Sequence, residues 1–183
     1  MMRPPVMYAN DEWQNKGRHA NVALDLITQQ HIKIVIMAAC WNSYFLAPQF
    51  KERLIFTVQT ILRSGARVYV LKDVPRPGFY VPQEVSLNVM HGKDLSLLGS
   101  TPSEYSDLNK PMDEIFDQLS KIGATVLDPT TYFINSHGLY GVVKNGQVLY
   151  RDDNHLSVEG AALLAPMFEP IFQTNIVLTS SRR

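Results

Sequence analysis

Apolar residues in the first half of the chain recur with two different periods. The segment IKIVIMAA at 32–39 is short and rich in β-branched residues, which predicts a buried strand. In QFKERLIFTVQTILRSG, Phe50, Leu54 and Val58 recur at four-residue steps, which predicts a helix that ends near Gly65. ARVYVLKD follows as a second buried strand, and ANVALDLITQQ precedes the first strand as a helix. A strand, a helix and a parallel strand form a right-handed crossover unit.

The second half of the chain repeats this alternation. The segment TPSE at 101–104 combines an N-cap threonine, a proline at the first helical position and a glutamate three residues on, which predicts a helix start. We expect Pro111 to divide this region, so that a separate helix, MDEIFDQLSKIG, precedes the strand ATVLD. GVVKNGQVLY predicts a hairpin because Asn145-Gly146 suits the two positive-φ positions of a type I′ turn. A final helix is predicted to begin near Ser157.

Alternating strands and helices predict an α/β fold, namely a three-layer α/β/α sandwich with a mainly parallel sheet. A length of 183 residues with 45% hydrophobic content suits one domain over residues 1–183. The Pro-rich segment at 73–83 is predicted to be a loop within that domain, because each of its prolines lacks a backbone donor.

Charge and cysteine content exclude some classes of protein. Lys plus Arg equals Asp plus Glu at 17 each, so no net field would recruit nucleic acid or an anionic membrane. The single cysteine, Cys40, cannot form an intramolecular disulfide and is expected to be a small core residue. The N-terminal residues form no continuous apolar segment, so we expect neither a signal peptide nor a membrane span.

Asp152 and His155 form an Asp-x-x-His pair directly before the last predicted helix. Such a pair suits acyl chemistry, because a neutral imidazole can take a proton from a hydroxyl nucleophile while a carboxylate on its other nitrogen stabilises the imidazolium. The alternative is structural: Asp152, Asp153 and Asn154 form a turn, and His155 is a solvated residue before a helix cap. The spacing alone leaves both interpretations open.

The segment LYRDDNHLSVEGAALL resembles the C-terminal block of SGNH-type hydrolase domains, in particular those fused behind the transmembrane domain of the family 3 acyltransferases, which O-acylate bacterial surface polysaccharides. IVIMAACWNSY, ARVYVLKDVPRP and ATVLDP resemble other segments of that group in the same order, so the likeness runs from about residue 30 to 172. The resemblance implies an SGNH/flavodoxin-like fold.

The resemblance also implies roles for individual residues. Asp152 becomes the carboxylate of a Ser-His-Asp triad and His155 its general base. Asn42, or the backbone of Trp41, is the nearest counterpart of the family's oxyanion-hole asparagine. A Trp41 and Tyr44 pair after a strand is otherwise more often rim or core packing than a platform for substrate.

One expected part of the family pattern is absent from the sequence. The nucleophile of the family lies in a Gly-Asp-Ser block at the end of the first strand, and these residues contain no Gly-Asp-Ser. We therefore expect an N-terminally truncated SGNH domain without its first strand and without a nucleophile. Loss of a central strand exposes a sheet edge, which predicts marginal stability or self-association.

The resemblance implies transfer of an acyl group, most simply acetyl, to a polysaccharide or sugar hydroxyl, or to water in an esterase reaction. It implies acetyl-CoA as donor for the full-length family through a transmembrane acyltransferase domain, with no cofactor held by this chain. The site would face the periplasm or the cell exterior in the parent protein, and the chain expressed alone would be cytoplasmic. Whether the chain is itself an enzyme stays open, because the serine is absent.

Two other functions are compatible with the sequence. A non-catalytic remnant could bind glycan or a partner chain through a cleft around Trp41, Tyr44 and His155. The alternation of strands and helices also fits a nucleotide-binding flavodoxin-like domain, although no Gly-rich turn supports it. The five histidines are scattered without ligand spacing, so no metal site is predicted.

Overall fold

Three short strands form the centre of the computed structural model, which describes residues 21–173. They are β1 (Ile34–Ala38), β2 (Arg67–Leu71) and β4 (Thr125–Leu127), and they pair in parallel in the order β1-β2-β4. Their apolar, β-branched residues suit a sheet with helices on both faces. Within the described residues β1 pairs only with β2, so no strand covers its other edge there. The predicted parallel sheet is confirmed.

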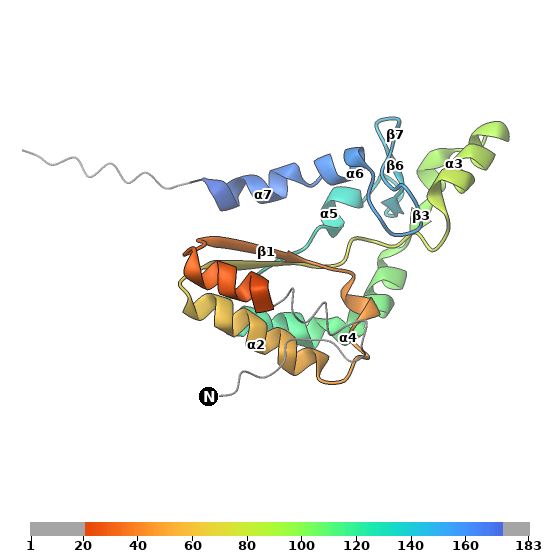
Figure 1. The fold of residues 1–183 in the computed structure, drawn as a ribbon. Coiled ribbons are helices and arrows are strands. Elements are labelled where there is room, and N and C mark those ends of the chain that lie inside the picture. The colour runs from red at the N-terminus through yellow and green to blue at the C-terminus, as the bar shows by residue number, and fades with distance from the viewer. Residues whose placement is uncertain (1–20, 174–183) are drawn as a thin grey trace, which may run out of the picture.

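One face of the sheet is covered by two amphipathic helices, α2 (Phe50–Arg63) and α4 (Pro102–Lys121), which lie below the strands in Figure 1. Val68 and Val70 alternate along β2 and point into this layer, where both are almost fully buried. A helix over 21–29 and the short η1 (Trp41–Ser43) complete this side. The predicted helix-strand-helix-strand order of the first half is confirmed.

The opposite side of the sheet carries a second hydrophobic cluster. Figure 1 shows α7 (Ala165–Phe172) and α5 (Thr130–Phe133) above the strands, opposite to α2 and α4. The Arg67 side chain ties α7 to β2, because its Nη2 donates to the Ile171 carbonyl at 3.0 Å. The result is the predicted three-layer α/β/α arrangement. The remaining elements on this side are α3 (Val81–Met90), η2 (Leu95–Leu97), β3 (Gly99–Ser100), β5 (Tyr140–Gly141), β6 (Val143–Lys144), β7 (Gln147–Val148) and α6 (Val158–Ala162).

The prediction that Pro111 divides two helices was wrong. α4 runs through Pro111 as one helix of 20 residues, begun by the predicted capping box of Thr101 and Glu104. Proline in a helix interior removes one hydrogen bond and costs about 3 kcal/mol. Asn109 and Met112, which flank Lys110 and Pro111, are both buried, and this packing offsets the loss.

The loop predicted over residues 73–83 ends earlier in the structure than expected. α3 begins at Val81, with Pro82 in its first turn, where a missing N–H costs nothing. Val81 is fully buried in the second cluster, which holds this turn in place.

The hairpin and the last helix start were predicted correctly. β6 and β7 pair in antiparallel register across Asn145 and Gly146, which have φ values of 52° and 75°. Ser157 caps α6, because its Oγ accepts the Gly160 N–H at 3.0 Å. The final helix, however, is divided, since the chain turns at Leu163 and Leu164 before α7.

Candidate functional site

Asp152 and His155 lie on the loop between β7 and α6 and touch each other. His155 Nδ1 is 2.8 Å from Asp152 Oδ2, and the backbone N–H groups of Asn154 and His155 donate to Asp152 Oδ1 at 2.9 and 2.6 Å. These backbone hydrogen bonds, with a smaller contribution from the His155 ring, hold the pKa of Asp152 down to about 2. An ionised carboxylate only accepts, so Nδ1 carries the proton and Nε2 of a neutral His155 is left as an acceptor.

The loop that carries this pair is anchored on both sides. Ser157 donates its N–H to Leu149 O at 2.9 Å and its Oγ–H to Val148 O at 2.7 Å, which joins the start of α6 to β7. Gly160 makes this contact possible, because a Cβ at that position would lie 2.0 Å from Leu149 O. Buried Tyr150 donates its hydroxyl to Pro75 O at 2.7 Å and so ties the loop to the Pro-rich segment.

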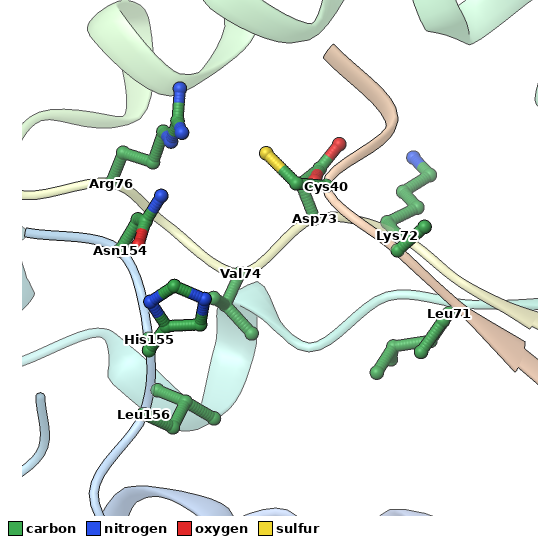
Figure 2. Close-up of a pocket in the computed structure, with 11 residues that line it drawn as sticks. Cys40, Leu71, Lys72, Asp73, Val74, Arg76, Asn154, His155 and Leu156 are labelled. Carbon is green, nitrogen blue, oxygen red and sulfur yellow. The ribbon is translucent and has the colours of Figure 1, made fainter. Parts of the chain in front are cut away.

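His155 lines a cavity of about 380 Å³ at the carboxyl ends of β1 and β2. Open parallel sheets bind their ligands at this end of the strands. Figure 2 shows His155, Asn154 and Arg76 on one side of the cavity and Cys40 and Asp73 on the other. The lining residues are Ala38, Ala39, Cys40, Leu71, Lys72, Asp73, Val74, Arg76, Asn154, His155 and Leu156.

Trp41 and Asn42 lie in η1, beside the cavity rather than in its lining. Trp41 is only 3% exposed and packs against Phe50, with ring centroids 6.5 Å apart. Its backbone N–H donates to Asp73 Oδ1 at 3.0 Å and its indole N–H to Leu71 O at 2.7 Å. The Asn42 amide donates to Asn109 Oδ1 at 2.8 Å. Both Trp41 donors are engaged, so an oxyanion role for the Trp41 backbone would require its hydrogen bond to Asp73 to break, while the Asn42 amide has one of its two N–H groups bonded to Asn109.

Comparison with known protein families decides the identity of the domain. The family described as "SGNH domain (fused to AT3 domains)" matches residues 3–170. The chain belongs to this SGNH family. The family predicted from the sequence is thereby confirmed.

A solved structure has a similar fold. The periplasmic domain of a lipopolysaccharide acetyltransferase from Salmonella ser. Paratyphi A superposes with a TM-score of 0.63 at 18% identity. The alignment covers 82% of this chain and 60% of that one, so this SGNH domain spans less than two thirds of its structural neighbour. No curated protein sequence matches the chain. At this identity the likeness establishes the fold alone.

The SGNH domain presents no hydroxyl nucleophile to His155 within residues 21–173. The only side chain there that hydrogen-bonds to the imidazole is Asp152. On the opposite wall, Cys40 Sγ lies 3.0 Å from Ser43 Oγ. Cys40 is half-buried and lines the cavity, so the expectation that it is a core residue was wrong.

Sequence reasoning missed Asp73, which is 7% exposed and lines the same cavity as His155. Its carboxylate accepts the Trp41 N–H, and its carbonyl accepts the Tyr105 hydroxyl at 2.9 Å. Desolvation raises the pKa of Asp73, although the backbone N–H groups of Trp41 and Asn42 act in the opposite direction. A signal was present, because an acidic residue at the carboxyl end of a buried strand of a parallel sheet lies where such folds bind ligands.

The described residues show two further properties of the domain. Across residues 21–173, no three His, Cys, Asp or Glu side chains come together in a group that could hold a metal ion. Over the same residues, none of the helices is both long and apolar enough to cross a membrane.

Proposed function

We propose that this SGNH domain takes part in acyl transfer or ester hydrolysis, with His155 as the general base of a Ser-His-Asp triad and Asp152 as the carboxylate that orients it. The observation that carries the proposal is the 2.8 Å contact between Asp152 Oδ2 and His155 Nδ1 at the rim of a cavity. Membership of the SGNH family supports the same reaction class.

In the proposed reaction, His155 Nε2 removes the proton from a serine hydroxyl as its oxygen attacks the acyl carbon of an ester. Asp152 stabilises the imidazolium that forms. The imidazolium then gives its proton to the departing alcohol, which leaves an acyl-serine. A sugar hydroxyl or water attacks that ester in a second step, with His155 again the base. The serine must come from outside residues 21–173 or from another polypeptide.

The proposed acyl group is acetyl and the proposed acceptor is a hydroxyl of a cell-surface polysaccharide. The structural neighbour is the periplasmic domain of a lipopolysaccharide acetyltransferase, and this likeness supports the substrate class and a periplasmic or external site. The proposed donor is acetyl-CoA, used by a transmembrane acyltransferase domain of the parent protein. The acyl group would then reach this domain already released from coenzyme A.

A second candidate function is binding without turnover. It is favoured by one observation, namely that no nucleophile contacts His155 among the described residues. In this alternative the domain binds glycan or a partner chain through the same cavity.

Hydrolysis of 4-nitrophenyl acetate separates the two functions when it is measured with the serine present, in the parent protein or together with the polypeptide that supplies the serine. If the domain is an enzyme, His155→Ala lowers the rate by about 10²-fold or more, because the general base is lost. His91→Ala is the matched control, since His91 is an exposed histidine outside the cavity lining and its loss leaves the rate unchanged. Equal rates for the wild type and His155→Ala would contradict the enzymatic proposal. Glycan binding without turnover would establish the alternative.

A further inference from the structure

Two buried oxygen atoms beside His155 have no hydrogen-bond partner. The Asp73 carboxylate accepts the Trp41 N–H at Oδ1 and is also stabilised by the Asn42 backbone N–H, but no group within residues 21–173 makes a hydrogen bond to Asp73 Oδ2. Asn154 Oδ1 likewise accepts no hydrogen bond within the described residues, although the Asn154 backbone N–H donates to Asp152. A buried acceptor without a donor costs about 1–3 kcal/mol, so two of them beside one cavity require an explanation.

Both residues line the cavity that His155 lines, and they come from different elements. Asp73 follows β2, while Asn154 belongs to the loop before α6. Figure 2 shows them on opposite sides of the cavity, with His155 next to Asn154. A ligand in the cavity would therefore lie between the two residues that carry these acceptors and beside the imidazole.

The charges around the cavity indicate what net charge a ligand should have. Arg76 and Lys72 line it together with Asp73, and Lys72 Nζ is also 3.3 Å from Asp128 Oδ2. The two cationic side chains disfavour a cationic ligand, while the Asp73 carboxylate disfavours an anionic one. Each hydroxyl of a saccharide both donates and accepts, so an uncharged saccharide can satisfy Asp73 and Asn154 and also accept from Arg76.

We infer that this cavity is an acceptor subsite for an uncharged sugar residue, in which Asp73 and Asn154 accept hydrogen bonds from the hydroxyls next to the one that reacts. This inference rests on the proposed function and deepens it, because it assigns residues that orient the acceptor sugar. Asp73 is a specificity residue in this scheme, and it also holds the Trp41 backbone in place.

The test is a titration of the whole chain with methyl α-galactopyranoside, methyl α-glucopyranoside and their monodeoxy analogues, followed by NMR. Asp73→Asn keeps an oxygen for the Trp41 N–H but replaces the second carboxylate oxygen with a neutral amide donor. Asn154→Ala removes the side-chain acceptor and keeps the backbone N–H that Asp152 needs. Each variant is expected to weaken binding of the parent glycoside by about tenfold in Kd. Asp153→Asn, an exposed neighbour, is the control and leaves Kd unchanged.

The deoxy analogues supply the decisive comparison. Wild type is expected to lose about tenfold in Kd for one deoxy analogue, and Asp73→Asn is expected to bind that analogue as weakly as its parent sugar. Equal losses in wild type and variant for every analogue would overturn the inference. So would chemical-shift changes at Asp73 and Asn154 caused by Mg²⁺ or phosphate and not by any glycoside.

Failure of this inference is distinguishable from failure of the proposed function. If His155→Ala abolishes ester hydrolysis but no glycoside binds the wild type in the cavity, the subsite is overturned and the reaction class stands. If the Asp73 and Asn154 effects on glycoside binding hold while His155→Ala leaves hydrolysis unchanged, the subsite stands as a binding site and the enzymatic proposal fails.

Discussion

Asp152 and Asp73 are two carboxylates of one site whose surroundings shift their pKa values in opposite directions. Backbone N–H groups hold the pKa of Asp152 down, while burial raises that of Asp73. Asp152 is thus kept ionised to orient His155, whereas burial makes the ionised form of Asp73 less favourable. Such divergence of neighbouring titratable groups is typical of functional sites.

Asp152→Asn tests the first of these effects. The variant can still accept the two backbone N–H groups but has lost the charge. Because the folded-state pKa is lowered, the charge adds stability above pH 3.8, and this contribution disappears as pH falls toward about 2. We expect wild type to have the higher Tm at neutral pH, with the difference shrinking over that acidic range in thermal melts. A difference that is constant with pH would contradict the assignment.

Asp73→Asn is expected to behave in the opposite way. Its pKa is raised, so Asp73 contributes its full stability below its unfolded value of 3.8 and loses it as the pH rises. At neutral pH the neutral amide avoids the burial of a charge, and the variant should melt at the same temperature as wild type or higher. That advantage should vanish below pH 3.8 in the same melts. A large loss of Tm at neutral pH would show that the charge itself stabilises the fold.

At the scale of elements, the approach of α6 to β7 sets the position of the His155 loop. Gly160→Ala would place a Cβ 2.0 Å from the Leu149 carbonyl oxygen, so α6 must move away from β7. Overpacking of this kind costs about 1–3 kcal/mol. The Asp152–His155 contact should loosen as well.

Chemical denaturation of Gly160→Ala measures this cost, and NMR of the His155 ring follows the contact. Ala161→Ser, at an exposed position of the same helix, controls for the substitution of a helical residue and should cost a few tenths of a kcal/mol at most. Wild-type stability in Gly160→Ala would mean that the close packing of α6 does not position the loop.

At the scale of the whole molecule, β1 forms one edge of the three-stranded sheet. No strand pairs with this edge within the described residues, and Ile36 is 37% exposed. The strand IVIMA contains no charge or proline, which are the usual protections of a sheet edge. An edge of this kind is a template for pairing with a second chain.

We therefore predict that the chain self-associates and that Ile36→Lys prevents it, because a lysine at the strand centre opposes edge-to-edge pairing. Sedimentation equilibrium over a concentration series should show a rising apparent mass for wild type and a monomer for the variant. Val22→Lys is the control, because Val22 is 65% exposed but lies on the helix over 21–29. A monomeric wild type that melts cooperatively would contradict the prediction.

The sequence by itself determined the three parallel strands, the helix α2, the β6–β7 hairpin and the identity of the Asp152–His155 pair. These depend on local patterns, such as the apolar periodicity of α2, the Asn145-Gly146 turn and the four-residue DDNH segment. The continuity of α4 through Pro111 could not be predicted, because burial of Asn109 and Met112 against residues distant in the sequence outweighs the local cost of a proline.

Only the tertiary structure decided which residues share the cavity. Asp73 and Asn154 are 81 positions apart, and nothing local to either segment shows that β2 and the loop before α6 end at the same place. The engagement of Trp41 and Asn42 with Asp73, Leu71 and Asn109 is likewise a property of packing. Local hydrogen bonds and apolar periodicity depend on residues that are close in the sequence, so they can be predicted from it. The burial of a side chain and the loss of its hydrogen-bond partners depend on which distant segments pack together.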